Sequence, residues 1–435
     1  MYLLSQIIKW LKANFIHVLL EIIKWLKANF IHVLLEIIKW LKANRMISLS
    51  VIHALWMLIL TFVWLNRSVT YGDEMFLIQM TSGVKRLILG LEEKPDKNDF
   101  LFVNVAYDRK LIEKRKNGIF SGNQDITDRA KLAQFFRVLS QRPDNHRFIL
   151  CDIFFRDPSP DDRMLLTEMR KMRHILIPYH KTAPGRWEFP IFDGIESGAA
   201  DYTTADTKGT FLKFALTGED MRKTIPLRMY ERLHSATFRK KGFLYLMNGK
   251  LSLNSVILDF RIRNSHLNEG GYYGDFCMNL WELLSLPDAV LHELTKDRII
   301  VIGDLKERDM HETVFGETAG TLILLNAYLS LVNKENIVSA PLIMVLFGVC
   351  LLLSFHIFSG KTLEERQWRI RMIRSVIRGR FIAKLVNYLL VLGAFSVILY
   401  FIFNIHINIL LIAAYLTVLE SVIRYVGKKR QSPVP

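Results

Sequence analysis

The chain has 435 residues, 51% of them apolar, and a formal net charge of +16. This apolar fraction, together with a positive mean hydropathy, excludes an ordinary soluble enzyme and indicates long apolar segments. Much of the basic charge lies beside those segments, where it orients a chain in a membrane and attracts anionic lipid headgroups, so no nucleic-acid partner is expected.

A perfect tandem repeat occupies the beginning of the chain. The fifteen letters IIKWLKANFIHVLLE occur twice from Ile7, and a third copy breaks off at Asn44. At about 100° per residue the apolar side chains fall on one stripe, with Lys9 and Glu21 outside it. Residues 1–45 are therefore predicted to form a cytoplasmic amphipathic helix that lies in the headgroup layer or contacts a partner, such as a second copy of the chain. A duplicated lead-in without a function is the alternative, because identical copies indicate a recent duplication or an engineered insertion.

Four apolar segments are long enough to cross a hydrocarbon core of about 30 Å as helices. They comprise residues 46–66, 340–358, 381–403 and 405–425. The first is too long for the apolar part of a cleavable signal peptide, and it ends in Asn66-Arg67, which is a poor cleavage site. All four segments are therefore predicted to remain as transmembrane helices.

The orientation of these helices follows from the positions of Lys and Arg. Residues 1–45, 359–380 and 426–435 are rich in basic residues, which are retained on the cytoplasmic side. The connection Asn404 to Asn408 carries no formal charge. Both termini are therefore expected in the cytoplasm and residues 67–339 outside it, in a multi-pass protein of the bacterial inner membrane.

Apolar runs alternate with helical patterns through residues 67–339. Strands are predicted at Phe100–Tyr107, Phe148–Phe155, Ile175–Tyr179, Val256–Phe260 and Ile299–Gly303. Helices are predicted at Glu74–Leu89, Asp125–Ser140, Asp161–Met172 and Glu317–Val332. Because uninterrupted Val, Ile, Leu and Phe runs are typical of strands buried on both faces, the pattern predicts an extracytoplasmic α/β domain with a mostly parallel sheet.

Five candidate aspartates lie at the carboxyl ends of two of these strands or in the loops that follow. Asp152, Asp157 and Asp161 belong to the end of the second strand and its loop, and Asp304 and Asp309 come after the last strand. The carboxyl ends of parallel strands meet at one edge of a sheet, where α/β proteins build ligand sites, so these five are the candidate ligand-binding residues. The alternative is structural, since surface acids are common and Asp161 follows Pro160 at a natural helix start, where it would act as a cap.

Two of the three cysteines lie in the predicted outer domain. Cys151 and Cys277 would face an oxidising compartment, where a disulfide between them is one interpretation. The other is a buried free thiol at Cys151, which lies in an apolar strand. Both interpretations remain open on the sequence.

No catalytic, metal-binding or cofactor-binding pattern is complete in the sequence. His292-Glu293 begins like the helix motif of zinc proteases, but Lys296 stands where the second His must be. Gly360-Lys361-Thr362 resembles the end of a phosphate-binding loop, yet Phe355 replaces its leading Gly. The sequence therefore predicts no enzymatic activity, no metal and no cofactor.

The basic connection between the second and third spans has an amphipathic pattern. Apolar residues alternate there with the basic ones, and the predicted docking residues are Arg366, Trp368, Arg371, Arg374 and Arg378. Such a helix would bind a cytoplasmic or membrane protein partner, or would contact only anionic lipid headgroups.

The segment Lys296 to Val332 resembles the closing signature of the type-two CHASE domains, the cyclase- and histidine-kinase-associated sensory extracellular domains. The matching positions are Ile302-Gly303, Asp309, Thr313, Gly320 and Asn326-Ala327, with Val314, Ala319 and Leu325 as departures. The segments Phe148 to Leu165 and Val256 to Asn264 resemble earlier strands of that family, and the arrangement of one leading and three trailing spans extends the resemblance to everything from Met46 onward. The resemblance implies a sensory domain that passes a change through the membrane.

Three functions are compatible with these patterns. The first is a membrane sensor whose output lies on a separate polypeptide, since only about ten residues follow the last span and these cannot fold as an output domain. The second is a structural or assembly subunit, either a scaffold or an oligomerising effector of a membrane complex. The third, a membrane enzyme, is disfavoured by the missing active-site pattern.

Overall fold

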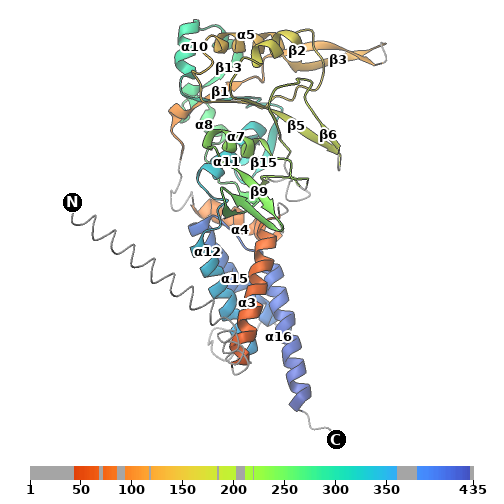
Figure 1. The fold of residues 1–435 in the computed structure, drawn as a ribbon, viewed down its shortest axis with the longest axis vertical. Helices are drawn as coiled ribbons and strands as arrows, with labels where there is room; N and C mark the ends of the chain where they lie inside the picture. Colours follow the sequence, from red (N-terminus) through yellow and green to blue (C-terminus); the bar gives the residue numbers. More distant parts are fainter. Residues whose placement is uncertain are drawn as a thin grey trace, which may run out of the picture. The chain divides into compact units, whose positions relative to one another are not determined.

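The computed structural model describes residues 44–67, 72–85, 94–116, 119–183, 186–201, 211–218, 220–359 and 380–431 (Figure 1). The predicted amphipathic helix of residues 1–45 lies outside the described residues except at its last two positions. The predicted docking residues of the basic connection, Arg366, Trp368, Arg371, Arg374 and Arg378, lie outside them as well.

A seven-stranded, mostly parallel sheet forms the centre of the α/β fold, as predicted. Its strand order is β13-β1-β14-β4-β5-β6, with β7 also paired to β5, and only the β5–β6 pair is antiparallel. The strands are β1 (Phe100–Asn104), β4 (Phe148–Cys151), β5 (Ile175–Ala183), β6 (Arg186–Glu188), β7 (Ser197–Ala199), β13 (Cys277–Asn279) and β14 (Ile299–Gly303). The apolar runs at residues 100, 148, 175 and 299 therefore form strands of this sheet.

Helices cover both faces of the sheet. Successive residues of each strand point to opposite faces, so each strand contributes side chains to two cores. Ile300 and Ile302 pack in one core with residues of α5 (Arg129–Ser140), α6 (Asp162–Met169), α9 (Leu280–Leu284) and α10 (Asp288–Thr295). Ile299 and Val301 pack in a second core with residues of α7 (Ile225–His234) and α11 (Gly320–Val332). Burial on both faces explains why the strand sequences are apolar without alternation.

Four smaller sheets surround this centre. They are β2–β3 (Arg109–Lys116, Ile119–Thr127), β8–β12 (Lys213–Ala215, Ser255–Ile257), β9–β10–β11 (Phe238–Lys241, Leu244–Met247, Lys250–Ser252) and β15–β16 (Met310–Thr313, Gly316–Ala319), all antiparallel. The run Val256–Phe260 therefore lies outside the main sheet, against the expectation. The physical reason is that only alternate side chains of this run enter the core of the main sheet, namely Val256, Leu258 and Phe260. Asp259, between the last two, forms an ion pair with Lys85.

Two helices begin later than predicted. α5 starts at Arg129 because residues 125–127 continue β3, and Asp128 caps the helix by accepting hydrogen bonds from the N–H groups of Ala130 and Lys131. α11 starts at Gly320 because residues 317–319 pair with β15. The small remaining helix of this region is α8 (Asn264–Leu267). Sequence periodicity alone did not separate these strand ends from the helices that follow them.

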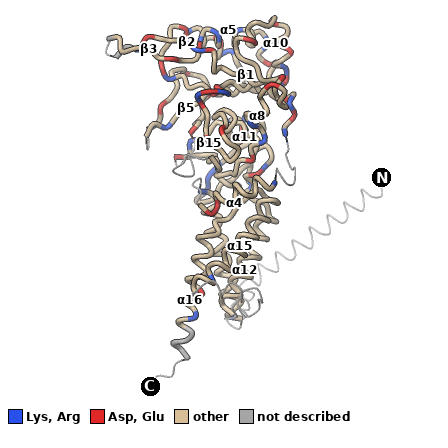
Figure 2. Tube along the Cα trace, turned by 180° about the vertical axis from the view of Figure 1, so that it is seen from behind, with Lys and Arg blue, Asp and Glu red and all other residues tan. Residues whose placement is uncertain are grey.

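Within the described residues, four helices are long and apolar enough to span a membrane, as predicted. The apolar stretches run over Arg45–Leu65 in α3, Ala340–Phe358 in α12, Phe381–Phe403 in α15 (Arg380–Phe403) and Ile409–Val426 in α16 (Ile409–Gln431). Figure 2 shows Lys, Arg, Asp and Glu throughout the α/β fold and few of them along α12 and α15. The chain is therefore a multi-pass membrane protein by the length and composition of these helices.

The fourth apolar helix begins at Ile409 and not at residue 405, because two asparagines shape the connection before it. Asn404 adopts a positive φ of 54° directly after α15, a conformation that ends helices. Asn408 accepts a hydrogen bond through Oδ1 from the N–H of Leu411 at 3.0 Å, as an N-cap does.

The described residues fall into two compact units. The larger contains the described residues between 61 and 342 and residues 384–417, so the α/β fold and the helix ends around residues 400–411 belong to one body. The smaller contains residues 44–60, 343–359, 380–383 and 418–431. Within the smaller unit, His53 Nδ1 lies 2.7 Å from Ser354 Oγ, and Arg424 pairs with Glu420 at 2.6 Å.

Candidate functional site

An open cleft of about 320 Å³ lies at the carboxyl edge of the parallel sheet. Four of the five predicted aspartates line it, namely Asp152, Asp157, Asp304 and Asp309. The loops after β4 and β14 carry these residues, and the two strands are direct neighbours in the sheet. We refer to this cavity as the sheet-edge cleft.

Asp152 follows β4 directly and is held by the start of α11. Its Oδ2 accepts a hydrogen bond from Thr321 Oγ1 at 2.8 Å. Thr321 in turn packs against Gly303, where a Cβ atom would collide with the threonine side chain. Burial, and then the nearby charge of Asp309, raise the pKa of Asp152 to about 7, so this carboxyl group can carry a proton near neutral pH.

Asp309 occupies the loop between β14 and β15, next to the beginning of α11. Its carboxylate lies against Gly320, where there is no room for a side chain, and its backbone oxygen accepts the N–H of Gly320 at 2.7 Å. His311 Nε2 lies 2.9 Å from Asp309 Oδ1. Two glycines thus make space at the start of α11, Gly303 for Thr321, which bonds Asp152, and Gly320 for the Asp309 carboxylate.

The other predicted aspartates have local partners. Asp304 accepts hydrogen bonds from the N–H groups of Lys306 and Glu307 at 3.2 and 2.9 Å, which shapes its own loop. Asp157 accepts a hydrogen bond from the side chain of Gln124. Asp161 does not line the cleft: it stands at the N-cap of α6, but its carboxylate binds Lys110 Nζ at 2.7 Å and makes no cap hydrogen bond. The expected capping role of Asp161 is therefore wrong, because its carboxylate forms an ion pair with Lys110 and accepts no N–H of the helix.

Arginines also line the sheet-edge cleft, and acids hold several of them. Arg109 pairs with Asp125 at 3.3 Å, and Arg156 pairs with Glu188 at 2.9 Å. Asp152 has a threonine and no cation at hydrogen-bond distance among the contacts of its carboxylate. Within the described ranges, no group of three or more His, Cys, Asp or Glu side chains is placed to hold a metal ion. The cleft can therefore offer arginine side chains and the Asp152 carboxyl group, which can carry a proton, to a ligand.

Cys151 and Cys277 do not form a disulfide. Two strands, β1 and β14, lie between their strands in the sheet, so their separation is beyond the reach of a disulfide. Cys151 is buried, and burial raises the pKa of its thiol. The interpretation of Cys151 as a buried free thiol is therefore confirmed.

Within the larger compact unit, the helix α4 (Gly72–Gly83) contacts both the α/β fold and the adjoining ends of α15 and α16. Glu74 forms a buried ion pair with Lys213 of β8, and each side chain is only 4% exposed. Burial raises the pKa of Glu74, and Lys213 opposes that rise. Beyond the other end of α4, Lys85 pairs with Asp259 at 2.7 Å. Ion pairs at both ends therefore fix α4 to the α/β fold.

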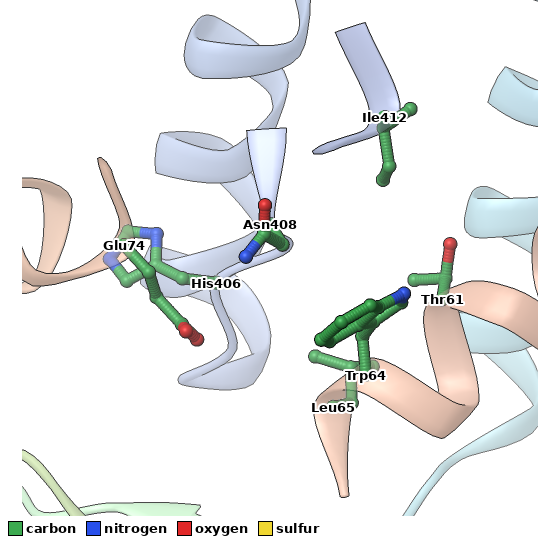
Figure 3. A pocket seen from close by; sticks show the side chains of 7 residues that line it. All are labelled: Thr61, Trp64, Leu65, Glu74, His406, Asn408 and Ile412. Atoms are coloured by element: carbon green, nitrogen blue, oxygen red, sulfur yellow. The ribbon is translucent and has the colours of Figure 1, made fainter. Parts of the chain in front are cut away.

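Hydrogen bonds fix α4 to the membrane helices as well. Thr81 Oγ1 lies 2.9 Å from His406 Nε2, and Ser82 Oγ lies 3.0 Å from Tyr400 Oη. Asp73 Oδ2 accepts the N–H of Leu410 at 2.8 Å. In Figure 3, Glu74 and His406 line a small pocket together with Trp64 and Asn408 of the adjoining segments. Its volume of about 10 Å³ is close to the minimum that holds one water molecule.

The β15–β16 hairpin joins the sheet-edge cleft to α4. It begins directly after Asp309, and its residue Glu312 accepts the N–H of Phe211 at 2.8 Å, two residues before Lys213. Val314, between the two strands, packs on a buried cluster of Ile78, Leu212, Ile257 and Tyr400. The backbone of the hairpin thus links the cleft loop to side chains of α4 and of α15.

Sequence reasoning missed α4 and its partners as functional residues. Glu74 lies within a predicted helix and Lys213 in a region with no assigned element, so nothing in the spacing pairs them. A weak pattern did exist: a His and two Asn in the short uncharged connection between two apolar helices, where polar side chains require partners.

The candidate site is defined by these contacts and by the chemistry of its own side chains. No family model matches this chain, and neither a curated protein nor a solved structure is significantly similar to it.

Proposed function

We propose that this protein is a membrane-bound sensor of the type-two CHASE kind, whose α/β domain takes up a ligand in the sheet-edge cleft and passes the change to its spanning helices. Its output lies on a separate protein that contacts the cytoplasmic segments. The proposal treats Asp152, Asp304 and Asp309 as ligand contacts, and it assigns no catalytic step to the chain.

One observation carries the proposal: the turn of the hairpin that follows Asp309 packs in a cluster that contains Tyr400 of α15. A ligand that moves Asp309 also moves β15, and Val314 beside it packs with Tyr400 of α15. Interfaces that are packed this tightly shift between discrete arrangements and do not deform continuously. This contact gives a sensor the physical connection that it needs.

The proposed location is the bacterial inner membrane, with residues 67–339 outside the cytoplasm and both termini inside. The positive flanks of the apolar segments support this orientation. In a Cys277→Ser background, a thiol introduced at Met164 is expected to react with an impermeant reagent added to intact cells. A thiol introduced at Arg371 should react only after permeabilisation, and labelling of both positions from the same side would contradict the orientation.

Coupling between the cleft and the helices is expected to appear in hydrogen exchange of the full chain in lipid nanodiscs. Asp309→Asn removes the charge that holds His311 and should loosen β15. Amides in residues 76–82 and 400–411 should then exchange faster, by about twofold or more, than in the wild type.

The matched control is Asp304→Asn, which lines the same cleft but bonds only within its own loop. Its exchange should change near residues 303–308 alone. If Asp309→Asn has equally local effects, the cleft is not coupled to the membrane helices, and the chain fits a structural or assembly subunit better than a sensor.

A further inference from the structure

The exposed face of α4 lacks charged residues. The helix residues that are exposed are Gly72, Phe76, Gln79 and Met80, and Phe76 is 63% exposed. The opposite face is buried and contains Glu74, Leu77, Ile78, Thr81 and Ser82. A surface helix in water normally directs its polar side chains outward, whereas α4 buries three polar side chains and exposes Phe76 and Met80.

Among the described residues, the two acids within α4 and the lysine directly after it contact protein groups. Asp73 accepts the backbone N–H of Leu410, Glu74 pairs with Lys213, and Lys85 pairs with Asp259. The outward face therefore presents no charge that would oppose contact with an apolar medium.

The contacts of α4 place it at one end of two spanning helices. Ser82 reaches Tyr400 in the last turn of α15, and Asp73 reaches Leu410 in the first turn of α16. Tyr400 is three residues before the end of α15, about 4.5 Å along the helix. Because the helix is bonded to both of these ends, it runs across them near the boundary of the apolar segment.

The exposed side chains beside these contacts are apolar too. Ile402 of α15 is 65% exposed and Leu410 of α16 is 45% exposed, in the part of each helix that would face lipid. Phe76 and Met80 of α4 are exposed apolar side chains of the same compact unit.

From this arrangement we infer that α4 is a lipid-binding interfacial helix, with Phe76 and Met80 inserted between headgroups and acyl chains at the membrane face where α15 joins α16. Helices of this kind lie about 5–10 Å into the boundary between headgroups and acyl chains. The inference needs only that the four apolar helices span a membrane, and it stands whether or not the sheet-edge cleft senses a ligand.

Depth-dependent fluorescence quenching tests the inference on the full chain in phosphatidylcholine and phosphatidylglycerol vesicles. In a Cys277→Ser background, Phe76→Cys and Met80→Cys are labelled with a nitrobenzoxadiazole dye. The Cys277→Ser protein without a further substitution is treated in the same way, to verify that the buried Cys151 and Cys350 take up no dye. Lipids with a nitroxide near the headgroup should quench both positions at least about twofold more strongly than lipids with a nitroxide at the end of the acyl chain.

The matched control is Val290→Cys on α10, which is 43% exposed but distant in sequence from α4 and its partners. It should be quenched by aqueous iodide and not by nitroxide lipids. Gln79→Cys, on the same exposed face, replaces either α4 variant that fails to fold.

Two results would overturn the inference. Quenching of the α4 positions by iodide to the same degree as position 290 would show that this face is in water. Protection from iodide without quenching by nitroxide lipids would show that another protein, such as a second copy of the chain, covers it.

Discussion

Replacing Lys213 by Met is expected to lower the free energy of unfolding by about 3–5 kcal/mol, because it leaves the buried Glu74 carboxylate without its partner. Glu74→Met should cost a similar amount, since a lone ammonium group would then be buried. The measurement is the unfolding of the purified full chain in detergent, followed by its intrinsic tryptophan fluorescence.

The double variant Glu74→Met and Lys213→Met distinguishes the interaction between the two side chains from the contribution that each makes alone. With both charges removed, the loss should be far smaller than the sum of the two single losses, because an apolar pair avoids the desolvation of either ion. Arg173→Met serves as a control, since Arg173 and Asp144 form an exposed pair whose side chains are 68% and 73% accessible, and its effect should stay within about 1 kcal/mol. Additive losses in the double variant would show that the two side chains act independently.

The second large effect is the part of the pH dependence of stability that comes from Asp152, which Asp152→Asn should remove. The ordinary pKa of an aspartate here is 3.8, and the folded protein raises the pKa of Asp152 to about 7 through burial and the charge of Asp309. Between these values the folded state holds a proton that the unfolded state has released. The stability from this group is therefore fully present below about pH 4 and falls as the pH rises to about 7, by at most about 1.4 kcal/mol per pH unit.

Asparagine keeps an oxygen for Thr321 but cannot ionise, so the variant should gain stability relative to the wild type as the pH increases from 5 to 7. Chemical unfolding of both proteins at several pH values measures the difference. Asp304→Asn leaves Asp152 and Asp309 in place and should keep the pH dependence of the wild type. Parallel curves for the wild type and Asp152→Asn would contradict the raised pKa.

The apolar runs predicted the main sheet because burial on both faces requires uninterrupted hydrophobic strands. Ile299–Gly303 is a complete example, since each of its residues is buried and the strand lies between β1 and β4. The position of Asp152, Asp304 and Asp309 at one edge followed from the same parallel arrangement. Long apolar helices were equally predictable, because hydrophobic length alone decides whether a helix can cross a bilayer.

The rest depended on contacts between residues distant in sequence. Nothing in the sequence near Lys213 indicates that it pairs with Glu74, and nothing near Thr81 indicates that it meets His406. Gly303 and Gly320 were noted as sequence matches, but their physical role is to leave room for Thr321 and Asp309, which only the packing shows. The mistaken start of the helix at Asp125 has a local cause, because both Asp125 and Asp128 are plausible caps and strand β3 occupies the first of them.

The short connection at residues 404–408 restricts how α15 and α16 can move. A turn of this length, with α4 bonded on both sides of it, prevents either helix from sliding like a piston past the other. A movement of α4 would instead tilt the two helices together. A protein that binds the other ends of α15 and α16 would then respond to a change in their tilt angle and not to a shift along the membrane normal.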